Sequence, residues 1–98
     1  MTPGQGSPPA IGEAIAAIVR YALEHPEAKD ASEGIHRWWL PEGGERWEPE
    51  EVEVALEWLA GRGWIEERRA AGRRIWAVCT DRLTEMRSWI GDPEERYG

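Results

Sequence analysis

The most regular pattern of apolar and polar positions in the chain begins after Pro49. Four apolar residues follow the i, i+3, i+4, i+7 spacing of an amphipathic helix: Val52, Ala55, Leu56 and Leu59. Pro49 suits the first helical position, where its missing N–H leaves no hydrogen bond unmade, and Gly61 or Gly63 can adopt the left-handed conformation that ends a helix. We therefore predict a helix that starts at Pro49 and ends near Gly61.

Two short strands are predicted after this helix, from Trp64 to Arg69 and from Arg74 to Val78. The strands have aromatic or β-branched residues at their ends, and the segment between them, Ala70–Arg73, contains one glycine that can adopt a positive φ. These features predict a β-hairpin with an arginine-rich turn.

A scaffold helix is predicted near the start of the chain. Residues 1–9 contain three Pro and two Gly, which predicts a disordered tail. The helix then runs from Pro8 or Ala10 to about Glu24, because Pro26 disfavours helical geometry in the residue before it. Its apolar stripe consists of Ile11, Ile15, Ile18, Val19 and Ala22.

A second helix is predicted from Ala31 to about Leu40, because Asp30 to Glu33 matches a capping box. Its apolar members are Ile35, Trp38 and Trp39. Gly34 is unfavourable inside a helix, so we expect another backbone to pass close to it. We expect that backbone to belong to the scaffold helix. Residues 41–48 then form a long loop.

A closing helix is predicted from Asp81 to Ile90, with Thr80 as its N-cap. Its apolar residues are Leu83, Met86 and Ile90. Residues 92–98 form a polar tail. The prediction is therefore one α+β domain over residues 10–91, with a three-helix bundle, a two-stranded hairpin and a C-terminal closing helix.

With these elements in place, the chain resembles the winged helix-turn-helix superfamily over roughly residues 10–91. The resemblance rests on ALEWLAGRGWIEER followed by GRRIWAV, which looks like the third helix of that superfamily running into its wing. The run HPEAKDASEGIHRWWL also resembles small stand-alone bacterial proteins of unknown function. The superfamily implies a winged-helix fold without catalysis. Most members read DNA with the third helix and the wing, and a substantial minority bind proteins.

Charge is distributed unevenly along the chain. The net charge is −7 at pH 7 and the pI is near 4.8, the wrong sign for a domain that neutralises phosphates. Residues 42–57 contain seven Glu and one Arg, whereas residues 62–74 contain five Arg and two Glu. Any contact with nucleic acid should therefore come from the hairpin.

The outward face of the helix that begins at Pro49 is acidic. At about 100° per residue, Glu50, Glu53 and Glu57 point away from the apolar stripe. In a DNA-reading helix this face enters the major groove and offers basic or amide side chains. The carboxylates therefore disfavour DNA, and they indicate either a solvated face or contact with a basic partner.

Three apolar residues lie on or near this acidic face. Val54 and Trp58 fall beside the acidic stripe, and Trp47 lies in the preceding loop. One interpretation is an exposed patch of the kind found at protein interfaces. The alternative is that the loop folds back and Trp47 covers the other two. The candidate protein interface consists of Trp47, Glu50, Glu53, Val54, Glu57 and Trp58.

Four arginines surround the predicted turn: Arg68, Arg69, Arg73 and Arg74. They could bind phosphates through charge-assisted hydrogen bonds. They could instead pair with Glu66 and Glu67 across the strands, or with the acidic helix of a second copy, which would give a homodimer.

The sequence lacks motifs for catalysis or metal binding. His25, His36 and Cys79 share no ligand spacing, and there is no HExxH, CxxC or phosphate-binding glycine loop. We therefore expect no enzymatic activity, metal, cofactor or small-molecule substrate. A single cysteine, the lack of a leader and the lack of a long apolar stretch predict a cytoplasmic protein without membrane contact.

The predicted function is a non-enzymatic module that acts by macromolecular contact. The leading hypothesis is a protein-interaction, adaptor or regulatory role through the helix that begins at Pro49. The alternative is a DNA-binding transcriptional regulator that contacts phosphates through its hairpin.

Overall fold

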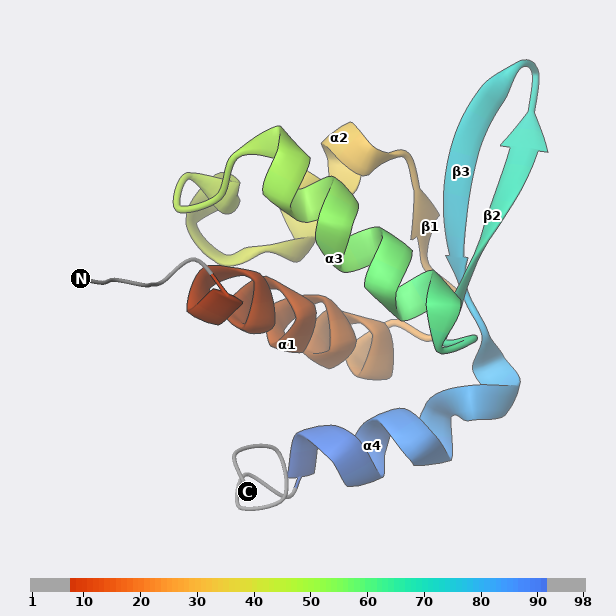
Figure 1. The fold of residues 1–98 in the computed structure, drawn as a ribbon. Helices are drawn as coiled ribbons and strands as arrows, with labels where there is room; N and C mark the ends of the chain where they lie inside the picture. The colour runs from red at the N-terminus through yellow and green to blue at the C-terminus, as the bar shows by residue number, and fades with distance from the viewer. Residues whose placement is uncertain (1–7, 92–98) are drawn as a thin grey trace.

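A computed structural model describes residues 8–91, which form helices around a three-stranded antiparallel sheet (Figure 1). The elements are α1 (Pro8–Glu24), β1 (Lys29–Asp30), α2 (Ser32–Gly34), α3 (Pro49–Gly61), β2 (Ile65–Ala70), β3 (Arg73–Val78) and α4 (Leu83–Gly91). The α+β class predicted from the sequence is confirmed. Helix α1 begins two residues before the predicted domain boundary, and most of the predicted N-terminal tail and all of the C-terminal tail lie outside the described residues.

The core lies between α1 and α3, which pack against each other. On α3 the predicted stripe is confirmed, since Val52, Ala55, Leu56 and Leu59 are at most 1% exposed. On α1 the buried residues are Ala14, Ile15, Ile18, Val19 and Ala22, while Ile11 is only partly buried. The helical spacing read from the sequence therefore selected the correct face of both helices.

Helix α3 ends in a Schellman motif. The Trp64 N–H donates to the Leu59 carbonyl at 3.1 Å, and the Gly63 N–H donates to the Ala60 carbonyl at 2.9 Å. Gly63 has a φ of +79°, so of the two candidate glycines, Gly61 and Gly63, it is Gly63 that takes the left-handed position. This turn directs the chain from α3 straight into β2.

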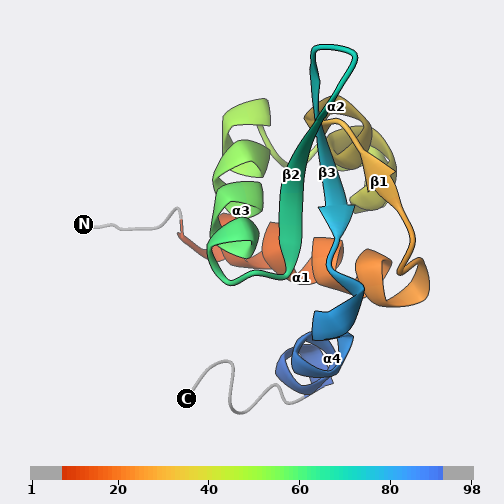
Figure 2. The ribbon, with the colours of Figure 1, turned by 90° about the vertical axis from the view of Figure 1, so that its right-hand side faces the viewer.

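The sheet has the strand order β1-β3-β2, and Figure 2 shows β2 as its outer strand. In the hairpin, Ala70 pairs with Arg73 across a two-residue turn in which Ala71 and Gly72 both have positive φ. The sequence predicted two strands, and the structure adds β1. A strand of two residues is too short to show an alternation of apolar and polar side chains in the sequence. It forms here because β3 provides its hydrogen-bonding partners.

The segment predicted as one helix from Ala31 to Leu40 is instead a single α-helical turn, α2, continued by a π-helical turn, Ile35–Trp39. The predicted capping box does not form, because the Asp30 carboxylate accepts the N–H of the adjacent Ala31. The side chain of Asp30 lies directly against Gly34, so the group that approaches this glycine is a carboxylate and not the backbone of α1.

The wider π-helical turn also determines the position of Trp38, one of the three apolar residues named for this segment. Ile35 and Trp39 face the core, whereas Trp38 is 68% exposed. In a π-helix successive residues rotate by less than in an α-helix. The face predicted from α-helical spacing therefore does not apply to this segment.

The loop before α3 folds back onto the domain and corrects the prediction for Trp47. The Nε2 atom of His36 lies 2.8 Å from both the Gly44 and the Trp47 carbonyl oxygens. Because both partners are acceptors, Nε2 carries the proton and donates to them. The loop held in this way places Trp47 in the core, where it is 4% exposed, so its predicted place on an exposed patch is wrong.

Helix α4 closes the domain by packing against α1. The predicted start at Asp81 lies in a 3-10 turn, Thr80–Arg82, and the α-helix itself begins at Leu83. Met86 is buried and Leu83 packs against the core. The Trp64 indole donates to the Glu85 carboxylate at 3.1 Å, which ties α4 to the start of β2.

Candidate macromolecular interface

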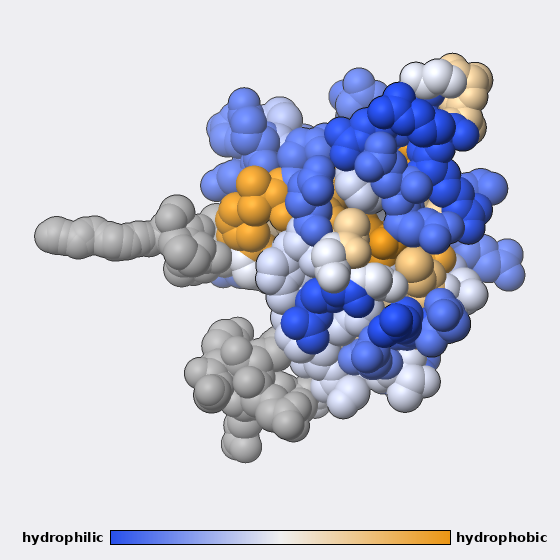
Figure 3. Space-filling model, turned by 45° about the vertical axis from the view of Figure 1, so that its right-hand side comes forward, coloured by the Kyte–Doolittle hydropathy of each residue, from blue (hydrophilic) through white to orange (hydrophobic). Residues whose placement is uncertain are grey.

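The acidic face of α3 lies on the surface beside the β2–β3 hairpin. Glu50 and Glu57 are exposed, Glu53 is half-buried, and Val54 remains 52% exposed. Hydrophilic side chains cover most of this side of the molecule, with smaller hydrophobic areas between them (Figure 3). Although the preceding loop folds back, it leaves Val54 and Trp58 uncovered.

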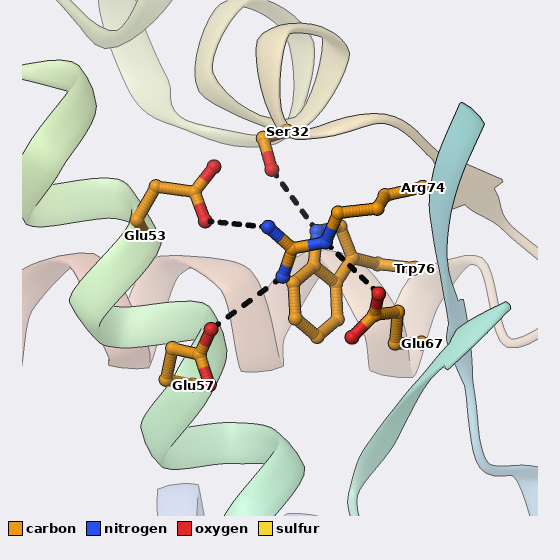
Figure 4. A network of polar contacts seen from close by, with 6 residues as sticks. All are labelled: Ser32, Glu53, Glu57, Glu67, Arg74 and Trp76. Atoms are coloured by element: carbon orange, nitrogen blue, oxygen red, sulfur yellow. Dashed lines mark hydrogen bonds and ion pairs between the residues drawn. The ribbon is translucent and has the colours of Figure 1, made fainter. Parts of the chain in front are cut away.

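Arg74 contacts three carboxylates, two on α3 and one on β2, and so joins the hairpin to α3 (Figure 4). Its Nε lies 3.0 Å from Glu67, and its two terminal nitrogens lie 3.5 Å from Glu57 and 3.9 Å from Glu53. The guanidinium also lies 5.0 Å from the ring centroid of Trp76. Arg74 is therefore neutralised within its own chain, and two of the three outward-facing glutamates of α3 already face a cation.

The other hairpin arginines differ in their partners. Arg68 forms an ion pair with Glu66 at 2.7 Å, and Arg73 lies at 4.0 Å from Glu33 on α2. Among residues 8–91, Arg69 forms no ion pair. The hairpin therefore carries less free positive charge than its sequence indicates.

Trp58 belongs to an aromatic cluster at the C-terminal end of α3. Its ring centroid lies 6.0 Å from those of Trp64 and Trp89, and the guanidinium of Arg62 lies 4.8 Å from Trp58 and 4.7 Å from Trp64. Trp58 keeps 38% of its surface exposed. Trp58 therefore presents an aromatic edge held by its neighbours, one helical turn from Val54. The sequence pattern did not indicate that Arg62 would contact it.

A second surface feature lies next to Trp38, where α2 and the segment after it meet Arg73 of the hairpin. It is a cleft of about 460 Å³ lined by Asp30, Ala31, Glu33, Gly34, Arg37, Trp38 and Arg73. Its lining includes two carboxylates and two guanidinium groups, so it offers no net charge to a ligand. Arg73 is the one hairpin arginine that faces this cleft.

The residues weighed for metal or nucleophilic chemistry lie apart. His25 packs against Tyr21, and His36 holds the loop described above. Burial raises the pKa of the Cys79 thiol, and the nearby carboxylates of Glu66 and Asp81 raise it further. Within residues 8–91, no group of three or more His, Cys, Asp or Glu side chains is placed to hold a metal ion.

No protein-family model matches this chain, and no curated protein or solved structure matches it either. Within residues 8–91, none of the helices combines the length and apolar character that a membrane span needs.

Proposed function

We propose that this chain is a winged-helix module without enzymatic activity that binds a basic segment of another protein through the outward face of α3. The element order supports the winged-helix assignment. Helices α1, α2 and α3 precede the hairpin, which follows α3 directly, and α4 closes the domain. This is the order on which the sequence resemblance rests.

The observation that carries the proposal is the charge of α3. Its outward side chains are Glu50, Glu53 and Glu57, and the nearest hairpin cation, Arg74, is already held by carboxylates. A helix of this kind placed against DNA would bring carboxylates toward phosphates. A basic protein segment placed there would instead be attracted, because each of its cations approaches an acidic surface.

The exposed apolar groups of α3 indicate which other side chains the partner presents. Val54 and the edge of Trp58 offer a small apolar centre, and the glutamates form a polar rim around it. A large aromatic residue held in place loses little conformational entropy on binding, so Trp58 is the expected main contact. The partner therefore presents an apolar side chain flanked by Lys or Arg.

A second candidate function is weak binding of nucleic-acid phosphates by the hairpin. It is favoured by Arg69, which has no ion pair within residues 8–91, and by Arg73, whose side chain is 66% exposed. Such binding would be sensitive to salt and largely independent of base sequence.

Amide NMR titration separates the two functions. The probes are an amphipathic leucine–lysine peptide, a leucine–glutamate peptide of the same length, and a random-sequence DNA duplex. We expect the basic peptide to shift the signals of Glu50, Val54 and Trp58. Glu50→Lys should abolish these shifts, whereas Glu24→Lys, the same charge change at an exposed position on α1, should preserve them.

The acidic peptide should leave the spectrum unchanged, and DNA should shift only hairpin signals and only at low salt. DNA binding that persists at moderate salt and is lost on substitution in α3 would contradict the proposal. So would equal responses to the basic and acidic peptides.

A further inference from the structure

The cleft beside Trp38 is a surface that the proposed contact through α3 does not use. It has a volume of about 460 Å³ and lies where α2 and the π-helical turn Ile35–Trp39 meet Arg73 of the hairpin. Among residues 8–91, its lining includes none from α3. Single π-helical turns are found frequently at functional sites. A ligand in this cleft would therefore leave the acidic face of α3 free.

Trp38 provides the cleft with an open aromatic ring. The residue is 68% exposed, and within residues 8–91 it makes no ring contact and no hydrogen bond. The core does not use it, because the next residue, Trp39, is buried and stacks on Tyr21. Nucleic-acid bases stack on exposed aromatic side chains of this kind, since every base has a π face. The cleft therefore has a surface that suits a flat ring.

Two guanidinium groups provide the cleft with anion-binding groups. Arg37 is exposed and forms no ion pair in the part of the chain that the structure describes. The side chain of Arg73 is 66% exposed, and its contact with Glu33 spans 4.0 Å, which is too long for a hydrogen bond. An exposed pair of this kind contributes little. A phosphate group, which forms strong charge-assisted hydrogen bonds with arginine, can therefore replace Glu33 as the partner of Arg73.

Asp30 provides a fixed acceptor. Its Oδ1 accepts the Ala31 N–H at 2.8 Å, and its carboxylate lies against Gly34, so the group is held in one place. Its Oδ2 accepts no hydrogen bond from the residues that the structure describes. A carboxylate oxygen can accept an N–H of a ligand, and the exocyclic amine of a base is such a donor.

We propose that this cleft binds a nucleoside 5′-phosphate unit whose base carries an exocyclic amine. The base stacks on Trp38, the phosphate binds Arg37 and Arg73, and the amine donates to Oδ2 of Asp30. The cleft has no net charge, and a nucleotide suits it because the donor and the anion of the ligand lie at opposite ends. A free nucleotide and the terminal nucleotide of a single strand share this chemistry.

This site is separate from both functions considered above. Contact with a basic segment uses α3, and binding of duplex phosphates by the hairpin involves no stacked base, because the bases of a duplex are stacked on one another. Failure of nucleotide binding would leave the α3 proposal unaffected. Loss of peptide binding in Glu50→Lys would likewise leave the cleft unchanged.

Amide NMR titration of the full chain with adenosine 5′-monophosphate (AMP) tests the site. The signals of residues 30–38 and of Arg73 should shift and saturate with a dissociation constant below about 1 mM, while those of Glu50 and Val54 should not move. Adenosine lacks the phosphate and inorganic phosphate lacks the base, so each should bind at least about fivefold more weakly. A dissociation constant above about 1 mM for AMP, or equal binding of AMP and adenosine, overturns the proposal.

Substitution of Trp38 separates stacking from apolar contact. Trp38→Leu keeps an apolar side chain but removes the aromatic face, so AMP binding should weaken by roughly tenfold, whereas Trp38→Phe should retain most of it. Thermal unfolding checks that both variants fold. Equal binding by wild type and Trp38→Leu would overturn the proposal.

Arg37→Gln tests the phosphate contact and should weaken AMP binding by about fivefold or more, because a charge-assisted hydrogen bond is lost. Arg69→Gln is the matched control, since it makes the same charge change on the hairpin outside the cleft, and it should bind AMP as wild type does. Equal losses in the two variants would assign the phosphate contact to general charge and not to the cleft.

The amine contact is tested with purine riboside 5′-monophosphate, which differs from AMP only in lacking the amine. Wild type should prefer AMP by about threefold or more, because one hydrogen bond is lost. Asp30→Asn should abolish this preference: the Ala31 N–H occupies the amide oxygen, so the amide nitrogen takes the place of Oδ2. Equal binding of the two nucleotides by wild type, or a preference that persists in Asp30→Asn, would refute the assignment of Asp30.

A short oligoadenylate with a 5′-phosphate identifies the source of the nucleotide. Binding at least about tenfold tighter than that of AMP would assign the cleft to the end of a single strand, since further phosphates then add contacts. Equal or weaker binding would assign it to a free nucleotide. Either result keeps the contacts with Trp38, Arg37 and Asp30, whereas an oligoadenylate that shifts only hairpin signals would overturn them.

Discussion

Arg74 offers the sharpest test of the packing between α3 and the hairpin. Arg74→Met keeps a long apolar side chain over Trp76 but removes the charge that faces Glu53, Glu57 and Glu67. An exposed ion pair contributes roughly 0.2–1 kcal/mol, and a cation over an indole ring roughly 0.5–1 kcal/mol. Since Arg74 is 39% exposed and two of its contacts exceed 3.4 Å, we expect a loss of about 1–2 kcal/mol in unfolding free energy.

The assay is denaturant unfolding followed by tryptophan fluorescence, at a protein concentration low enough to exclude association. Arg69→Met is the matched control, because Arg69 forms no ion pair within residues 8–91 and its replacement should change stability by less than about 0.5 kcal/mol. A double-mutant cycle of Arg74→Met with Glu57→Gln should show positive coupling that declines with added salt. Equal small losses for the two arginine variants would refute the inference that Arg74 is held by its own chain.

Three further outcomes are expected. Leu56→Ala should destabilise the domain by about 2–5 kcal/mol in chemical denaturation, because Leu56 is fully buried, whereas Val54→Ala at an exposed position should have little effect; similar losses at both positions would mean that the orientation of α3 is wrong. Hydrogen bonds, first from Arg82 and then from Trp64, hold the pKa of Glu85 below its ordinary value. The stability that Glu85 contributes is therefore present above its unfolded-state pKa and is lost as pH falls through its folded-state pKa. Glu85→Gln should therefore lower the melting temperature at neutral pH and differ little from wild type in acid, and a difference independent of pH would contradict this account. Because burial raises the pKa of Cys79, its alkylation in the native protein should be slower at neutral pH than after unfolding, and equal rates would contradict that burial.

Much of the helical framework could be predicted because helical periodicity is a local property of the sequence. Val52 and Leu56 are spaced to share one face whatever packs against them, and both are buried in the structure. The hairpin was predictable for the same reason, since Gly72 and the short turn fix the pairing of the strands on either side.

The candidate interface was only partly predictable. Glu50 and Val54 are exposed, as helical geometry required. The sequence offered the folding back of the Trp47 loop only as an alternative, because the burial of Trp47 depends on His36 reaching two carbonyls in the loop that follows it. Two of the three partners of Arg74 were also hidden, since Glu53 and Glu57 reach it from a different element, whereas the sequence had offered Glu67 as a cross-strand partner.

The sequence by itself determined α1 and α3 with their buried faces, the hairpin and the separation of acidic from basic segments. These features depend on residues within about one or two turns of each other, where spacing alone sets geometry. The tertiary structure decided the third strand, the return of the loop and the ion pairs of Arg74 with Glu53 and Glu57. Each of these depends on groups distant in sequence that meet only after α1, α3 and the sheet have packed, because hydrogen bonds and charges act through space and not along the chain.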